Sequence, residues 1–172
     1  MIVVPYDPRW PAEFEIERER IAAALGALAI RIEHNGSTSI PGLAAKPVID
    51  IQISVAPLHP VEVYAGGLAR LGYVHVPHPD DAFCPFFHQP AAWPHTHHVH
   101  LVQAGGEEER RALAFRDYLR EHAQVARDYE ALKRTLADRF GDEDFESRQA
   151  YADAKSEFIE RIVGIALAEG FP

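Results

Sequence analysis

The spacing of hydrophobic residues along the chain changes near residue 105. Before that point, short stretches alternate between apolar and polar residues, which is typical of β-strands with one buried face. In the clearest case, three isoleucines share one face of the stretch 48–55, and the opposite face carries Asp50 and Gln52. Further strands are expected over 30–33, 73–76 and 96–102, with an apolar candidate at 83–87.

After residue 105 the apolar residues recur every three or four positions, which is the period of an amphipathic helix. Helices are expected over 7–28, over 57–71 and over 151–165. Two more helices are expected between residue 107 and about residue 140. This order predicts an α+β fold with an α/β core over residues 1–105. A helical part over 106–172 packs on that core, and the whole chain, 1–172, forms a single domain.

A polar stretch between two of the expected strands is the best candidate for chemistry. Gly36 lacks a Cβ atom, so its backbone can approach a ligand closely, and Ser37 and Thr38 add hydroxyl groups and backbone N–H donors. A turn with successive exposed N–H groups is a natural cradle for an anion. Asp50 follows on an otherwise apolar strand, where an ionised carboxylate is costly without a partner. A phosphate cradle beside a lone acidic group suggests phosphate and metal chemistry.

The composition limits the class of function. The 172 residues carry a formal net charge of −9, which argues against a protein that coats nucleic acid but allows one nucleotide in a local basic pocket. No stretch is long and apolar enough to span a bilayer, and the single cysteine, Cys84, cannot form an internal disulfide. We therefore expect a cytoplasmic protein with no membrane partner. The apolar neighbours of Cys84 predict a buried, unreactive thiol.

A Gly-Ser turn after one strand, with an acidic residue on the next, resembles the nucleotidyltransferase superfamily, whose polymerase-β-like fold is a mixed sheet with helices. The segment 34–51, His-Asn-Gly-Ser-Thr-Ser-Ile-Pro-Gly-Leu-Ala-Ala-Lys-Pro-Val-Ile-Asp-Ile, resembles the signature of one family within it, the GrpB family. Further similar segments are 6–11, 96–100, 113–120 and 151–155, so the resemblance covers nearly the whole chain. Members of this family occur alone and fused to dephospho-coenzyme A kinase.

The resemblance implies roles for particular residues. Asp50 and Ser37 would form the catalytic centre, in which carboxylates hold divalent metals and the turn holds the phosphates. The expected phosphate-binding residues are Gly36, Ser37, Thr38, Lys46, Arg116 and Lys155. Lys46 has a second interpretation as the structural partner of a carboxylate. Arg116 and Lys155 are included because their helices resemble family segments, and arginine and lysine side chains suit phosphate contacts.

The acidic pair of the superfamily is incomplete here, because its second position is Gln52. An amide brings no charge, so Asp50 and Gln52 make a poor two-Mg²⁺ site. His98 and His100 share a strand face, and they would cluster with Asp50 if the two strands are neighbours. Such a set suits Zn²⁺ or Mn²⁺ better than Mg²⁺; alternatively, the histidines hydrogen-bond Asp50 or a phosphate directly. The expected cofactor is a divalent metal, Mg²⁺ or Mn²⁺ with Zn²⁺ as the alternative, at Asp50, His98 and His100.

Three functions fit these features. The first is a nucleotidyltransferase-like protein that binds a nucleoside triphosphate or another phosphorylated ligand; as an enzyme it would transfer a nucleotidyl group, with metal, to an unidentified acceptor. The second is a non-catalytic accessory or binding module with a protein partner, related to the domain fused to dephospho-coenzyme A kinase. The third is a histidine-based metalloprotein, suggested by the seven histidines between Tyr73 and Leu101.

Overall fold

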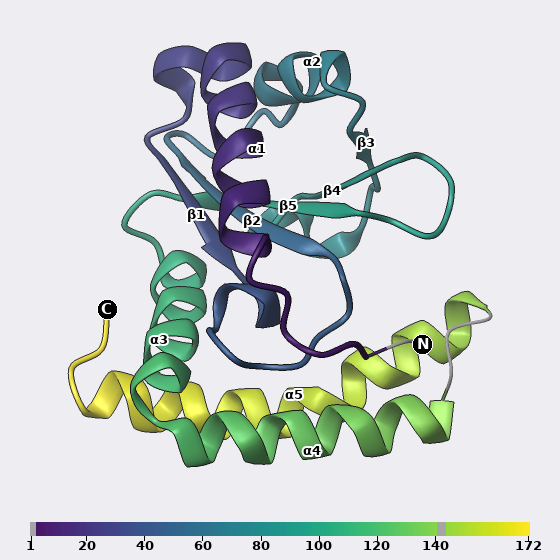
Figure 1. Cartoon of the computed structure of the whole chain (residues 1–172). Coiled ribbons are helices and arrows are strands. Elements are labelled where there is room, and N and C mark those ends of the chain that lie inside the picture. The colour runs from purple at the N-terminus through teal and green to yellow at the C-terminus, as the bar shows by residue number, and fades with distance from the viewer. Residues whose placement is uncertain (1–2, 141–143) are drawn as a thin grey trace.

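The computed structural model describes residues 3–140 and 144–172, in which a five-stranded sheet lies between two groups of helices (Figure 1). The strands are β1 (Arg31–Asn35), β2 (Ile49–Val55), β3 (Val74–His75), β4 (Phe86–Gln89) and β5 (His97–Gln103). The α-helices are α1 (Trp10–Leu25), α2 (Glu62–Arg70), α3 (Glu107–Glu121), α4 (Ala123–Phe140) and α5 (Phe145–Ala168). Among these described helices, none is long and apolar enough to cross a membrane.

The sheet is mixed and has the order β1-β2-β5-β4-β3. β2 and β5 run parallel, whereas the other neighbouring strands run antiparallel. A parallel pair requires a long crossover, and here the crossover contains α2 and the hairpin of β3 and β4. The expected α+β class with a mixed sheet is confirmed, and β5 is the direct neighbour of the strand that carries Asp50.

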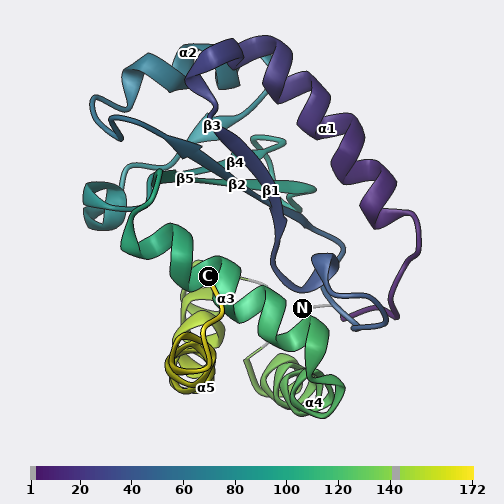
Figure 2. The same ribbon diagram turned by 90° about the vertical axis from the view of Figure 1, so that its left-hand side faces the viewer.

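One face of the sheet packs against α1 and α2, as Figure 2 shows. Ile49, Ile51 and Ile53 of β2 are buried on this face, together with Phe14 and Ile21 of α1. Because side chains alternate along a strand, the same periodicity sends Asp50 and Gln52 to the opposite face. The apolar pattern of the sequence therefore fixes which face of β2 is polar.

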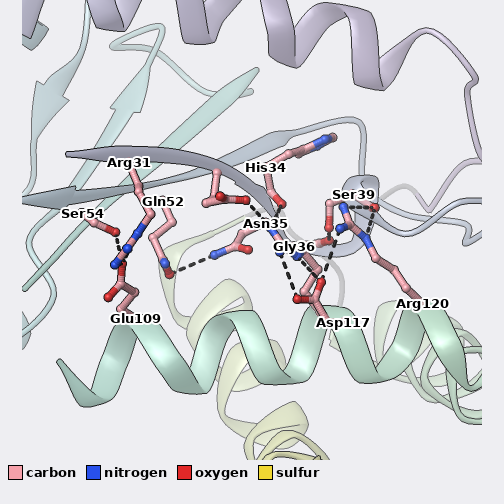
Figure 3. Close-up of polar contacts among 12 residues, drawn as sticks. Arg31, His34, Asn35, Gly36, Ser39, Gln52, Ser54, Glu109, Asp117 and Arg120 are labelled. Carbon is pink, nitrogen blue, oxygen red and sulfur yellow. Dashed lines mark hydrogen bonds and ion pairs between the residues drawn. The ribbon is translucent and has the colours of Figure 1, made fainter. Parts of the chain in front are cut away.

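The polar face of the sheet looks toward α3, with α4 and α5 beyond it (Figure 2). These helices form a second apolar cluster that includes Leu119, Tyr129 and Ile162. A row of polar contacts holds α3 against the sheet (Figure 3). Glu109 contacts both Arg31 and Ser54, and Arg120 donates two hydrogen bonds to the carbonyl oxygen of Ser39. The helical region is thus anchored along β1 and the turn that follows it.

Two elements differ from the sequence-based expectation, and proline explains both. Helix α2 begins at Glu62 rather than near residue 57, because the residue before Pro60 is disfavoured in a helical conformation. Strand β4 is Phe86–Gln89 rather than 83–87. Pro85 has no N–H to donate to a sheet ladder, so pairing starts after it.

Candidate functional site

The turn after β1 and the Asp50 carboxylate form one compact unit. Gly36 has φ 67° and ψ −174°, a backbone conformation that favours glycine, and residues Ser37–Ser39 then form a single 3-10 turn. A Cβ atom added to Gly36 would lie 2.2 Å from Oδ2 of Asp50. The absence of a side chain at Gly36 is what allows the carboxylate to lie against the turn.

Asp50 makes ion pairs with two histidines of the neighbouring strand. The parallel register aligns Asp50 with His98 and Gln52 with His100. His98 Nδ1 lies 3.3 Å and His100 Nε2 lies 3.9 Å from Oδ1 of Asp50. Burial opposes the charge of Asp50, but favourable interactions with the nearby His100 and His98 rings outweigh it and hold the pKa of the carboxyl well below its usual range. Burial also opposes the charge of His100, yet Asp50 and Cys84 raise its pKa to about 10. The structure therefore brings all three residues together as direct polar partners.

Further side chains contact the two histidines. Nε2 of His98 lies 3.2 Å from Nδ1 of His95, and the ring of His95 stacks on that of His88 with centroids 3.7 Å apart. Cys84 is half-buried, with its Sγ 3.8 Å from Nδ1 of His100. This differs from the expected buried thiol, because Phe87, which is 1% exposed, enters the core in its place.

A cavity of about 470 Å³ lies between the polar face of the sheet and helices α3 and α5. At one end it is lined by Gly36, Ser37, Asp50, Tyr129 and Lys155. The other lining residues include Asn35, Gln52, Cys84, His100, Val102, Phe115, Arg116 and Ile159. The cavity therefore joins the predicted phosphate turn to a helix that follows it by more than a hundred residues in the sequence.

The three lysines of the chain lie near one another, and one of them, Lys155, lines this cavity. The Nζ atoms of Lys46 and Lys155 each lie 4.5 Å from the ring centroid of Tyr151. Burial lowers the pKa of Lys155, while the negative charge of Asp50 opposes that effect. In the part of the chain that the structure describes, Lys155 makes no hydrogen bond or ion pair, and its recorded contact is with Tyr151.

Lys133 completes the group and was not anticipated from the sequence. Its side chain is 3% exposed, its Nζ donates to the carbonyl oxygen of Ala44 at 2.6 Å, and it lies 5.0 Å from the ring of Tyr129. Burial, followed by repulsion from Lys155, lowers the pKa of Lys133 to about 7. A signal was present: Lys133 stands between Tyr129 and Leu136 at helical spacing, on the apolar side of its helix.

Two other expected phosphate ligands are already engaged by the protein. Arg116 lines the cavity, but Nη1 contacts Glu33 and Nε contacts Asp117, both at 2.7 Å. Thr38 is 1% exposed, and its hydroxyl donates to the carbonyl oxygen of Val48. The charge of Arg116 is therefore compensated, and the Thr38 backbone, rather than its hydroxyl, is what remains for the predicted role.

Comparison with known proteins identifies the family. The family model described as GrpB protein matches residues 1–164. The chain belongs to the GrpB family. A UPF0157 protein of Pseudomonas aeruginosa is 40% identical over 169 residues, which cover 96% of this chain and 67% of that protein. The crystal structure of conserved protein GrpB from Enterococcus faecalis matches with a TM-score of 0.86 and 34% identity, over 99% of this chain and 100% of the other.

Some relatives are longer proteins with a different name. A dephospho-CoA kinase of Mycolicibacterium paratuberculosis is 34% identical over 161 residues, which cover 80% of this chain but 40% of the kinase. The GrpB-like region is thus a part of that protein. The resemblance first drawn from the segment 34–51 is confirmed for the family, and it extends to relatives that carry the kinase name.

The donor set of this GrpB-family chain does not fit the two-metal centre of a nucleotidyltransferase. Asp50 is one carboxylate, already paired with two histidines, and Gln52 accepts a hydrogen bond from Nδ2 of Asn35 at 2.9 Å instead of facing Asp50. Within residues 3–140 and 144–172, no three His, Cys, Asp or Glu side chains are grouped so that they could hold a metal ion. Two divalent ions need more oxygen ligands than these side chains offer.

Proposed function

We propose that this GrpB-family protein has a nucleotidyltransferase-type fold and binds a nucleoside triphosphate or another phosphorylated ligand in the cavity. One observation carries the proposal: Lys155 lines the cavity that Gly36 and Ser37 also line, and the other two lysines lie close to Lys155, Lys46 at the same Tyr151 ring and Lys133 near enough to repel its charge. Like charges repel, and the repulsion is strongest where water is scarce. An anion bound between the turn and α5 offsets that repulsion.

Lys155 is the central cation in this proposal, because the other cations of the cavity are compensated. Arg111 pairs with Glu160, and Arg116 pairs with Glu33 and Asp117. Lys155 instead contacts an aromatic ring, a position in which an ammonium group keeps its charge available for a ligand. A phosphate held by the turn would then receive its charge-assisted contact from α5.

The arrangement around Asp50 favours binding over nucleotidyl transfer. The two histidines lie against the carboxylate that would otherwise hold a metal, and Gln52 supplies no second charge. This supports the function of an accessory or binding module, and the relatives named dephospho-CoA kinase make dephospho-CoA a natural probe beside the nucleoside triphosphates.

Isothermal titration calorimetry with nucleoside triphosphates, dephospho-CoA and tripolyphosphate tests the proposal. We expect at least one probe to bind, and we expect Lys155→Met to weaken that probe by at least about tenfold, because a charge-assisted contact is lost. The matched control is Arg127→Met, which removes an exposed cation of α4 and leaves affinity unchanged. Absence of binding for every probe at millimolar concentration contradicts the proposal.

A further inference from the structure

Two buried amide side chains, Asn35 and Gln52, line the cavity, and each has an unused polar atom. Nδ2 of Asn35 donates to Oε1 of Gln52 at 2.9 Å, and Figure 3 shows both side chains between the strands and α3. Asn35 is 7% exposed and Gln52 is 1% exposed. Oδ1 of Asn35 and Nε2 of Gln52 have no hydrogen-bond partner among the described residues. Buried polar atoms without a partner are rare and costly, so this pair requires an explanation.

The unused pair consists of one acceptor and one donor, whichever way the amides are oriented. If both amides were flipped, Gln52 would donate to Asn35, and the remaining atoms would again be one donor and one acceptor. The antiparallel register aligns Asn35 with Asp50, so Gln52 is its diagonal neighbour on the same face of the sheet. The backbone therefore fixes the two amides side by side.

The surroundings of the amide pair suit a flat, largely apolar group. Val102, Phe115 and Ile159 line the same cavity, and the ring of Phe115 offers a stacking surface. The lysine end of the cavity lies beside Gly36, the residue directly after Asn35. A ligand with a phosphate at one end and a planar donor–acceptor edge at the other would satisfy both regions.

From this geometry we infer that Asn35 and Gln52 form a recognition site for the planar donor–acceptor edge of the phosphorylated ligand, either a nucleobase edge or a carboxamide. The inference rests on the proposed function and adds the chemical class of the ligand.

Titration of three kinds of probe separates the possibilities. Nucleoside triphosphates carry phosphates and a base edge, 4′-phosphopantetheine carries a phosphate and amides without a base, and tripolyphosphate carries phosphates alone. We expect wild-type protein to bind one of the first two at least about tenfold more tightly than tripolyphosphate. The probe that shows this advantage identifies the base edge or the carboxamide as the recognised group.

The variant Gln52→Met keeps the length of the side chain and removes the polar edge. We expect it to reduce the advantage over tripolyphosphate to within about twofold while tripolyphosphate itself binds as before. Lys155→Met has the opposite pattern, because it lowers the affinity for all phosphate-bearing probes by a similar factor. The inference is overturned if Gln52→Met still prefers the same probe over tripolyphosphate as strongly as the wild type does, or if the wild type shows no such preference. Neither result contradicts the proposed phosphate site. Failure of every probe to bind the wild type overturns both proposals.

A purely structural role for the amide pair gives a different result. In that case the double variant Asn35→Leu with Gln52→Met would melt at lower temperature and keep the wild-type selectivity. The recognition role predicts a melting temperature equal to or above that of the wild type, because unpaired buried atoms are removed, together with loss of selectivity.

Discussion

The two faces of strand β2 are built in opposite ways. On one face, Ile49, Ile51 and Ile53 belong to an apolar core cluster with residues of α1 and α2. On the other, Asp50 is paired with histidines and Gln52 has an unused amide group. Burying an apolar side chain stabilises the fold through the area removed from water, whereas a buried polar group contributes to stability only through its hydrogen-bonding or charged partners.

The two faces of this one strand therefore have different roles. The apolar face stabilises the fold through its buried apolar area, and its side chains tolerate little loss of volume. The polar face carries Asp50, which is paired with histidines, and Gln52, whose Nε2 has no hydrogen-bond partner among the described residues; both line the cavity. Under the proposed function these residues serve a ligand rather than packing, and the following changes test that division.

The largest effect on stability is expected at the apolar face. Ile51 is 0% exposed, and Ile51→Ala lowers the free energy of unfolding by about 4 kcal/mol, because it leaves a cavity in the core. Gln52→Met changes the adjacent, equally buried residue and costs less, about 1–2 kcal/mol, because it leaves Nδ2 of Asn35 without its acceptor but also removes the unpaired Nε2 donor. Urea denaturation of both variants provides the measurement. Equal losses would show that the two faces stabilise the fold in the same way.

Gly36 is expected to produce the next largest loss. Gly36→Ala must adopt a positive φ and place a Cβ against Asp50, which lowers the free energy of unfolding by about 3 kcal/mol. The control is Gly66→Ala in the exposed middle of α2, where nothing lies within 4 Å of the added atom. That change raises stability by up to about 1 kcal/mol. Thermal unfolding of the pair measures the difference, and a Gly36→Ala protein as stable as the wild type would contradict the packing against Asp50.

His34 makes the free energy of unfolding depend on pH. Its ring stacks on Phe14, its Nε2 lies 2.9 Å from Oγ1 of Thr38, and burial lowers its pKa from 6.5 to about 4. Between these pH values the unfolded chain binds a proton that the folded chain excludes. The contribution of His34 to stability is therefore complete above pH 6.5 and is lost as the pH drops toward about 4, by up to about 3 kcal/mol.

The variant His34→Gln keeps a donor toward Thr38 and removes the titrating ring. We expect chemical denaturation at several pH values to show a smaller loss of stability over this range than in the wild type. Thr38→Ser alters the same contact without removing the histidine, so it retains the wild-type slope. A His34→Gln profile parallel to that of the wild type would show that the acid sensitivity arises elsewhere.

The smallest effect concerns metal at the polar face. Gln52→Asp supplies a second carboxylate two residues from Asp50 on the same side of β2. We expect Mn²⁺ to bind this variant at least about tenfold more tightly than the wild type, or about 1.4 kcal/mol, as measured by calorimetry. Gln124→Asp adds the same charge on the exposed surface of α4 and serves as control. No gain in Gln52→Asp would mean that a missing carboxylate is not what keeps metal away.

The spacing of apolar and polar residues predicted most of the secondary structure and the polar face of the sheet that forms one wall of the candidate site. Alternation along the strands placed His98 and His100 on one face and Asp50 on the polar face of its own strand; the structure supplies the missing condition, because β2 and β5 are neighbours and bring the three residues together. The pairing of Gln52 with Asn35 was not predicted, because it depends on the strand register. Lys133 was missed for a related reason: a periodicity indicates which face of a helix is buried but not which distant ring covers it.

The contacts that hold the turn against the helices have a consequence for how the protein is made. They join residues that are 78 to 89 positions apart, from Arg31 with Glu109 to Ala44 with Lys133. Closing loops of that length costs entropy before any contact is gained. A ribosome synthesises the Gly-Ser turn more than a hundred residues before Lys155. The nascent polypeptide therefore cannot present the complete cavity until both segments have been translated.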